Sequence, residues 1–269
     1  MMKRLFGGLA LLALVLPAAA LADTQISAVG STALLPLVKE AATEYSSQHS
    51  DVKISVSGGG SYVGIAQARS GAAELGDSDV IAPGNSGLVD HKVAVVGFAI
   101  IVNPSARVSN LSAAQIRAIF SGRTTNWKDV GGADQGIVII NRPRTSGTRA
   151  VFNATMMGVS KINEAGLTVD SSGTVVTTVG TTPGSISYVA LAYTRDKPVT
   201  VVKVNGIAPT EANIMAGKYP IWSYEHIFTR GKGSPQIESF ISYISSNQSL
   251  LEKLGYIPVG RMKVKETNR

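Results

Sequence analysis

One local unit constrains the fold more than any other feature: an apolar run, a polar turn and a helix-type pattern. Its clearest copy has the run GIVII at residues 136–140, which predicts a buried strand, before the turn NRPRTSGTR at 141–149. A helix-type pattern follows at 150–157. Because such strands alternate with helices along the whole chain, the sequence predicts an α/β fold with largely parallel sheets.

Two further copies of this unit, and a short acidic strand, precede the one at 136–157. A strand at 25–29 is followed by Gly30-Ser31-Thr32 and by a helix that starts near Ala33 or Leu34, with Ser31 or Thr32 as its cap. A strand at 52–57 leads to three glycines and Ser61, and a short strand near 75–81 carries Asp77 and Asp79. Open α/β sheets bind ligands at the carboxyl ends of their strands, so we expect these turns to share a site.

The longest apolar run after the N-terminal segment lies at 93–102 and exceeds the usual length of a strand. It predicts a bent strand that leaves one sheet and enters another, with a crossover near Ile100. We therefore expect a discontinuous first lobe, 23–99 with 201–269, and a second lobe, 100–200. Binding turns on both sides of the crossover imply a cleft that closes by hinge motion.

The N-terminus has the features of a secretory signal peptide. Basic residues at 3–4 precede an apolar stretch, and an Ala-x-Ala site predicts a signal peptide over 1–22 with cleavage after Ala22. The chain has no cysteine, which excludes disulfides and the lipid-modified cysteine of a lipoprotein. The mature protein is expected in the periplasm or outside the cell.

Charge and composition argue against nucleic acid, metal or cofactor binding. The formal net charge of the 269 residues is +7, but the basic residues are scattered and no aromatic-interleaved basic stripe occurs. Asp77 and Asp79 have no nearby histidine or further carboxylate for a metal. The glycine turn at 58–60 is not followed by Gly-Lys-Ser/Thr, so it is not a nucleotide loop. We expect no cofactor.

The turn 141–149 suits a tetrahedral oxyanion. Its serine, glycine and threonine precede a helix start, where free backbone N–H groups meet the positive end of the helix dipole. Arginine side chains beside these groups add charged, forked donors.

Taken together, these motifs resemble the periplasmic phosphate-binding proteins of ABC phosphate transporters, in their shorter variant. The matching pieces are VGSTALLP at 29–36, GGGS at 58–61, LGDSD at 75–79, RPRTSGTR at 142–149, GSISYV at 184–189, NGIAPT at 205–210 and GKYP at 217–220. The resemblance implies a two-lobed, type II binding-protein fold: two mixed or parallel sheets, helices on both faces and a ligand cleft between the lobes. It also implies a monomer that serves an inner-membrane ABC permease.

The resemblance further implies which residues bind inorganic phosphate. Hydroxyl, N–H, carboxylate and guanidinium groups would come from Ser31, Thr32, Ala33, Leu34, Ser61, Asp79, Arg142, Ser146, Gly147 and Thr148. Asp79 would accept the O–H that phosphate carries at neutral pH. Sulfate has no such proton, and a site built to pair a substrate O–H rejects an analogue lacking it by a factor on the order of 10⁴.

Two residues depart from the family pattern. Arg144 is basic where longer relatives have an acidic residue that holds the ligand arginine, and Asp77 is acidic where many relatives have a small residue. We hypothesise that the two compensate, with Asp77 taking part of the orienting role. The departure leaves open another anion, such as arsenate or a phosphate ester.

Two other classes of function stay open on the same fold: a secreted phosphatase and an adhesion protein. Against an enzyme, the histidines at 49, 91 and 226 are isolated in the sequence, and no Gly-x-Ser-x-Gly elbow occurs. A binding protein without catalytic residues is therefore the expectation.

Overall fold

The structure, a computed structural model, describes residues 24–265. The expected signal peptide and its cleavage site lie outside these residues. The strands are β1 (Thr24–Gly30), β2 (Val52–Gly58), β3 (Leu75–Ser78), β4 (Leu88–Val102), β5 (Asn110–Leu111), β6 (Val138–Asn141), β7 (Leu167–Thr168), β8 (Ser185–Ala190), β9 (Thr200–Val204) and β10 (Trp222–Arg230). The α-helices are α1 (Leu35–Gln48), α2 (Ser61–Ser70), α3 (Ala113–Phe120), α4 (Gly147–Phe152), α5 (Ser172–Thr181), α6 (Glu211–Met215), α7 (Pro235–Ser246) and α8 (Gln248–Lys253).

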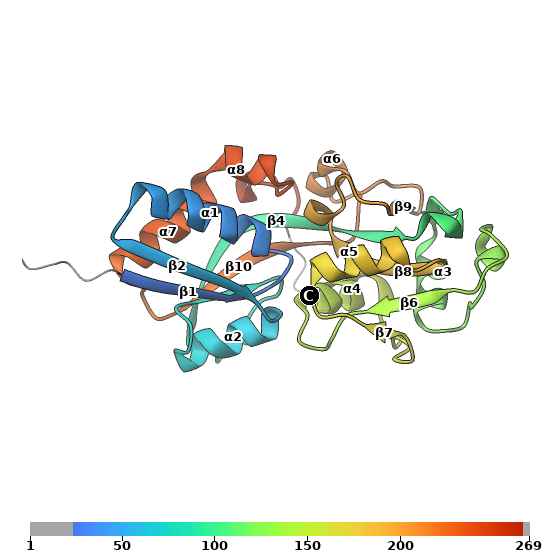
Figure 1. Ribbon diagram of the computed structural model, residues 1–269, viewed down its shortest axis with the longest axis horizontal. Helices are drawn as coiled ribbons and strands as arrows, with labels where there is room; N and C mark the ends of the chain where they lie inside the picture. The colour runs from blue at the N-terminus through green and yellow to red at the C-terminus, as the bar shows by residue number, and fades with distance from the viewer. Residues whose placement is uncertain (1–23, 266–269) are drawn as a thin grey trace, which may run out of the picture.

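The strand β4 joins two halves of the fold (Figure 1). Its first part, Leu88 to Gly97, pairs antiparallel with β10, and Phe98 to Val102 pairs antiparallel with β8. The expected strand that passes from one sheet to another is therefore confirmed. The strands follow one path in the order β2-β1-β3-β10-β4-β8-β6-β7, so the two expected sheets are continuous through β4.

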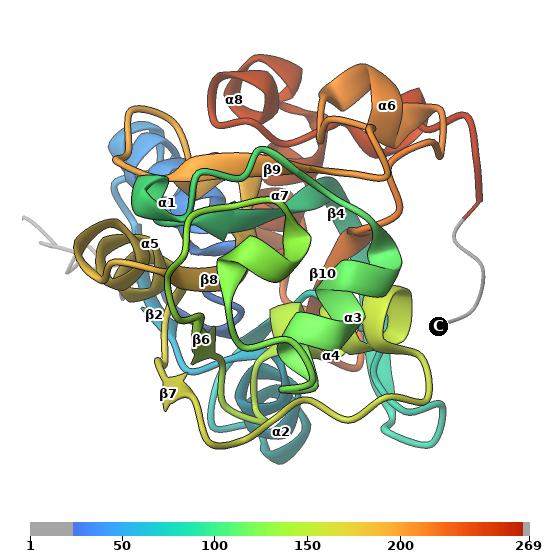
Figure 2. The ribbon, with the colours of Figure 1, turned by 90° about the vertical axis from the view of Figure 1, so that its right-hand side faces the viewer.

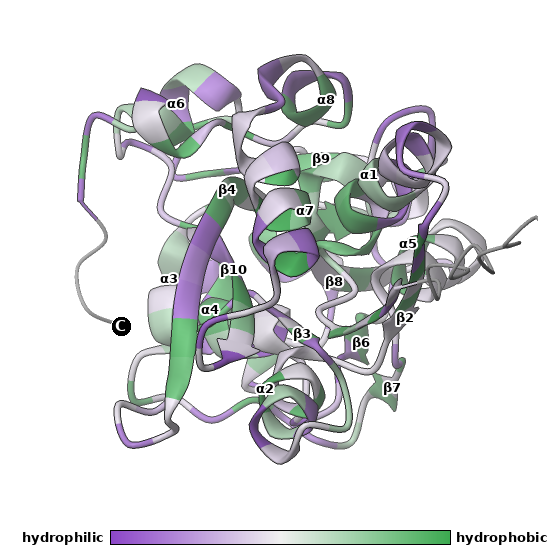
Figure 3. Cartoon of the chain, turned by 90° about the vertical axis from the view of Figure 1, so that its left-hand side faces the viewer, coloured by the Kyte–Doolittle hydropathy of each residue, from purple (hydrophilic) through white to green (hydrophobic). Residues whose placement is uncertain are grey.

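The second part of β4 is buried on both faces, which explains its unbroken apolar sequence. Ala99 and Ile101 pack in a small cluster with the valines of α5, whereas Ile100 and Val102 face the main core. The first part of β4 is more exposed, and Figure 3 shows its hydrophilic stretch flanked by hydrophobic residues. One strand thus combines a partly solvated start with a fully buried end.

In the first half, β1 lies between β2 and β3 and is parallel to both. The helices α1 and α2 lie on opposite sides of these strands (Figure 1). Apolar residues of α1 are buried against the strands, and Gly64 of α2 lies so close to Val29 that only a glycine fits there. These contacts fix the carboxyl ends of β1 and β3 side by side.

In the second half, β6 is parallel to β8 and to β7. Figure 2 views this half end on, with α5 on one side of β8 and α3 and α4 on the other. The strand β9 pairs with β4 at Ile100–Val102 and with β5, so it lies with the second half. The lobe boundaries stay a prediction, and this pairing favours a return to the first lobe after β9 rather than at 201.

Among residues 24–265, no helix combines the length and the apolar character needed to span a membrane.

Candidate functional site

Polar turns from both halves meet where β1, β3 and β6 end. The ten residues expected to bind an anion are all buried: Ser31, Thr32, Ala33, Leu34, Ser61, Asp79, Arg142, Ser146, Gly147 and Thr148. The fold brings them together because parallel strands place their carboxyl ends at one edge. Buried polar groups are costly unless they are hydrogen-bonded, so their partners define what the site can do.

The carboxylate of Asp79 receives donors from both halves of the fold. The hydroxyl of Ser31 donates to Oδ1, and Thr148 Oγ1 donates to Oδ2 over 2.7 Å. Burial raises the pKa of Asp79, while these two hydrogen bonds and the charge of Arg142 act in the opposite direction. The backbone N–H of Asp79 donates to Ser61 Oγ over 2.9 Å. Asp79 is thus a buried acceptor that is held in one orientation.

The guanidinium of Arg142 is fixed by neutral acceptors. Its Nε donates to the carbonyl oxygen of Val169 over 3.0 Å, and Nη2 donates to the carbonyl oxygen of Asp170 over 3.0 Å. Nη2 also donates to Thr32 Oγ1, 3.1 Å away in the other half. Burial lowers the pKa of Arg142, and the charge of Asp79 acts against that effect. A nearby anion would restore the favourable electrostatics that burial removes.

Ser172 belongs to the same group of residues, although the sequence analysis did not select it. Its Oγ lies 3.1 Å from Thr32 Oγ1 and 3.5 Å from Nη1 of Arg142, and it is fully buried. It opens α5 directly after the N-cap residue Ser171. A turn with hydroxyl side chains before a helix is the pattern that predicts the other binding turns. The same pattern occurs at Ser171 and Ser172, so the sequence did contain a signal for this residue.

The turn before α4 packs against the first half through a glycine. Ser146 caps α4, accepting a hydrogen bond at Oγ from the N–H of Arg149 over 3.2 Å. A Cβ at Gly147 would overlap the side chain of Ser61, so only glycine permits this approach. The N–H of Tyr62 also donates to the carbonyl oxygen of Thr145 over 3.2 Å. The two halves are therefore in direct contact at the site.

In the turn after β1, the expected cap by Ser31 or Thr32 is wrong, because α1 begins at Leu35 with Leu34 as its N-cap residue and no side-chain cap. Ser31 instead accepts hydrogen bonds within the turn. The N–H groups of Ala33 and Leu34 donate to Ser31 Oγ over 3.0 and 3.2 Å. Two tyrosines that the sequence analysis did not select support the same turn. Tyr193 donates to the carbonyl oxygen of Thr32 over 2.6 Å, and Tyr256 donates to that of Ala33.

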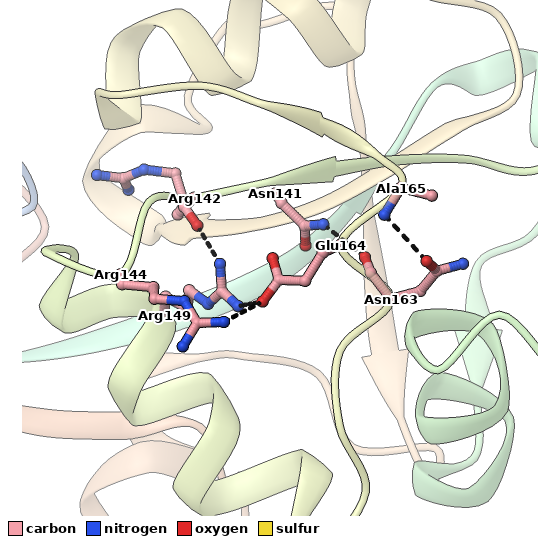
Figure 4. A network of polar contacts seen from close by, with 7 residues as sticks. All are labelled: Asn141, Arg142, Arg144, Arg149, Asn163, Glu164 and Ala165. Carbon is pink, nitrogen blue, oxygen red and sulfur yellow. Dashed lines mark hydrogen bonds and ion pairs between the residues drawn. The ribbon is translucent and has the colours of Figure 1, made fainter.

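The expected compensation between Asp77 and Arg144 is wrong. The side chain of Arg144 is 85% exposed, and its Nη2 pairs with Glu164 Oε1 over 3.3 Å. Glu164 Oε1 also accepts from Nη2 of the nearly buried Arg149 over 2.6 Å. Arg149 in turn donates from Nη1 to the carbonyl oxygen of Arg142 over 2.7 Å. Figure 4 shows this network, with the guanidinium of Arg142 pointing away from Glu164.

Asp77 occupies a different place, buried on β3 beside Asp79. Neither of its carboxylate oxygens has a hydrogen-bond partner within residues 24–265. Burial and the neighbouring charge of Asp79 raise the pKa of Asp77 to about 8. The side chain therefore carries a proton at neutral pH, so it does not act as an anionic orienting group.

The histidines make contacts outside this group of residues. His226 hydrogen-bonds Asp90 over 2.7 Å, His91 hydrogen-bonds Thr229 over 3.1 Å, and His49 stacks on Tyr45. Across the described part of the chain, no group of three or more His, Cys, Asp or Glu side chains is placed to hold a metal ion.

Comparisons with known proteins agree with this geometry. A family model described as a PBP superfamily domain matches residues 17–248. The phosphate-binding protein PstS of Bacillus subtilis is 41% identical over 251 residues, covering 90% of this chain and 83% of that protein. The chain belongs to the PBP superfamily and, within it, to the family of phosphate-binding proteins that includes this PstS.

Solved structures extend the comparison. A substrate-binding protein assigned to a phosphate ABC transporter of Clostridium perfringens, with phosphate bound, has a TM-score of 0.84 at 29% identity. The match covers 88% of this chain and 100% of that chain. An ABC-type phosphate transport receptor from Vibrio cholerae has a TM-score of 0.71 at 29% identity and covers 86% and 99% of the two chains. The expected α/β, type II binding-protein fold is confirmed.

Proposed function

We propose that this chain binds inorganic phosphate between its two halves and delivers it to an ABC permease for uptake. The observation that carries the proposal is the joint burial of Arg142 and Asp79 in one hydrogen-bonded group. Arg142 supplies a fixed positive charge, and hydroxyls from both halves supply donors. Charge-assisted hydrogen bonds of this kind are the strong ones in anion recognition.

Asp79 supplies the selectivity. A carboxylate repels an anion unless the anion donates a proton to it, and phosphate at neutral pH still carries an O–H. Sulfate offers only acceptors, so its binding would leave two negative oxygens in contact. A buried carboxylate that receives no proton from the ligand excludes sulfate more strongly than a difference in anion size would.

The ligand groups come from both halves, so binding is coupled to their closure. Ser31, Thr32, Ser61 and Asp79 precede the crossover in β4, and the other side-chain ligands follow it. An anion that enters between separated halves would gain its full set of donors only after they close. The two bodies of this motion would be the lobes expected from the sequence, 23–99 with 201–269 and 100–200, with the return to the first lobe placed after β9.

The remaining parts of the proposal concern location and chemistry. The chain would carry a signal peptide over residues 1–22 and act as a monomer in the periplasm or outside the cell. It would hold phosphate without turning over a phosphate ester. The names of its relatives, which are phosphate-binding and phosphate transport proteins, support a binding role.

Isothermal titration calorimetry of the mature protein tests the proposal, with phosphate, arsenate, sulfate, molybdate and a phosphate monoester as ligands. A hydrolysis assay on the same ester is run in parallel. We expect one tight site for phosphate, little heat with sulfate and no turnover. Absence of binding to every oxyanion, or hydrolysis of the ester, would refute it.

Two arginines of one turn provide a matched pair of variants. Arg142→Gln removes the buried guanidinium and should abolish measurable phosphate binding. Arg144→Gln removes an exposed guanidinium from the same turn and should leave the affinity within about twofold. Equal losses in the two variants would contradict the role of Arg142.

A further inference from the structure

Asp77 is a buried acid that the proposed binding mechanism does not use. It is fully buried in β3, two residues before Asp79, which directly follows the end of the strand and is also buried. In the sheet it lies between Gly30 of β1 and Ile227 of β10. Neither neighbour has a polar side chain, which explains why both Asp77 oxygens lack a hydrogen bond within residues 24–265.

The titratable groups around Asp77 come from several elements. Asp79 follows it on the same segment, and Glu225 of β10 is fully buried within hydrogen-bonding reach of Asp79. Burial raises the pKa of Tyr256, from the C-terminal segment, and the charges of Glu225 and Asp79 raise it further. Arg142 contributes a positive charge that favours the ionised form of Asp79. The buried carboxyls of Asp77 and Glu225 are thus both coupled to that of Asp79.

Charge balance then limits how many of these carboxyls can be ionised. A bound phosphate adds one or two negative charges next to Asp79, and like charges at short range in a buried site strongly oppose each other. Asp79 needs to be ionised if it is to accept the phosphate O–H. Among the residues that the structure describes, none donates a hydrogen bond that would stabilise an ionised Asp77.

This further step rests on the proposed function. We propose that Asp77 holds a proton while the anion is bound at the phosphate site, so that ionisation of Asp77 releases phosphate. The carboxyl of Asp77 acts through Asp79 and does not touch the anion. Phosphate binding would then be linked to one proton, in addition to the proton equilibrium of phosphate itself.

The direction of this linkage follows from the burial of Asp77. Its pKa of about 8 in the folded protein means that it is protonated at neutral pH and ionises under mildly alkaline conditions. A nearby phosphate favours the protonated form further, so binding at pH 8.5 should take up a proton. Above the pKa, the affinity should fall by up to tenfold for each pH unit, as linkage requires.

The test compares wild-type protein with Asp77→Asn, which is permanently neutral and nearly the same shape. Phosphate dissociation constants are measured by calorimetry from pH 6 to 9.5. The ratio of the wild-type constant to the Asp77→Asn constant should be nearly flat up to pH 7 and rise about fivefold between pH 8 and 9. Phosphate speciation is the same for both proteins and cancels in the ratio.

Glu74→Gln serves as the control, because Glu74 directly precedes β3 but is exposed and bonded to Ser27. It should follow the wild-type profile. Asp77→Ala, which also lacks the carboxyl, should follow Asp77→Asn and replaces it if the asparagine variant does not fold. A second readout is the proton uptake at pH 8.5, taken from binding enthalpies in two buffers of different ionisation enthalpy.

Parallel pH profiles and equal proton uptake for wild-type and the Asp77 variants would overturn the inference while leaving phosphate binding intact. If no protein, wild-type included, bound phosphate at any pH, the proposed function itself would fail.

Discussion

Replacing Glu164 by glutamine tests how Arg142, the arginine proposed to bind phosphate, is held in place. Glu164 Oε1 accepts from Arg149 over 2.6 Å and from Arg144 over 3.3 Å. The two arginines differ in environment, because the Arg149 side chain is 9% exposed and that of Arg144 is 85% exposed. Loss of the Glu164 carboxylate leaves the nearly buried charge of Arg149 without a counter-ion, whereas the charge of Arg144 stays exposed to water.

The expected magnitude follows from this difference. A hydrogen bond to a charged group contributes about 1.5–3 kcal/mol, while an exposed ion pair contributes about 0–1 kcal/mol. Glu164 is itself half exposed, so water replaces part of the lost interaction. We expect Glu164→Gln to lower the free energy of unfolding by about 1–2 kcal/mol and Arg144→Gln to lower it by less than about 0.5 kcal/mol.

Urea denaturation followed by circular dichroism in phosphate-free buffer measures both variants. A double-mutant cycle on Glu164 with Arg149, and another with Arg144, isolates the two pair energies. Arg149 lowers the pKa of Glu164, so the stabilisation is present above the ordinary glutamate pKa and is lost as pH falls through the lowered value. The wild-type advantage over Glu164→Gln should therefore vanish in acid.

Phosphate affinity provides the second readout. Arg149 donates to the carbonyl oxygen of Arg142, so a loosened Arg149 should weaken phosphate binding several-fold in Glu164→Gln. Equal coupling energies for the two arginines, or an effect of Glu164→Gln that persists unchanged at pH 3, would refute this reasoning.

Four other predictions concern single residues of the site. Asp79→Asn should reduce the preference for phosphate over sulfate from a factor on the order of 10⁴ to near unity, measured by competition binding. Asp77→Asn should have a higher free energy of unfolding than wild-type, and the difference should grow by about 1.4 kcal/mol per pH unit between pH 5 and 8. The reason is that folded wild-type protein holds a proton on Asp77 that the unfolded chain releases. A difference in urea midpoints that does not change with pH would contradict this. Arg142→Lys keeps the charge but loses the fork of donors to Val169 and Asp170, so calorimetry should show a loss of at least tenfold in phosphate affinity. Ser172→Ala should weaken phosphate binding several-fold without changing the phosphate-to-sulfate ratio, since it removes a hydroxyl and leaves Asp79 in place.

The sequence allowed the α/β class and the strand that passes between two sheets to be predicted, because both depend on local patterns of apolar runs, turns and helix starts. The ten residues expected to bind an anion follow from the family resemblance, and the structure shows that the fold buries them together. Ser172 shares the hydroxyl-turn pattern, but its contact with Thr32 spans 140 positions. A single sequence does not show which distant turns meet, so this residue was not selected.

The role of Arg144 was mispredicted for a related reason. Its position next to the phosphate arginine suggested that it replaces an acidic partner found in longer relatives. The direction in which a side chain points from a turn depends on tertiary packing, and here Arg144 points to solvent and to Glu164. Nothing within the turn itself signals that Glu164, twenty residues later, completes the network.

The geometry also explains how the site functions without an acidic residue at position 144. The guanidinium of Arg142 is oriented by the carbonyl oxygens of Val169 and Asp170, which hold it in place without neutralising its charge. Its backbone is held separately by Arg149, whose charge is balanced by Glu164. Carbonyl oxygens thus orient the guanidinium of Arg142, while the Glu164 carboxylate balances the charge of Arg149. In the proposed function, the positive charge of Arg142 acts on the anion and on Asp79, and we propose that the protonation of the nearby acid Asp77 sets the net charge of the site.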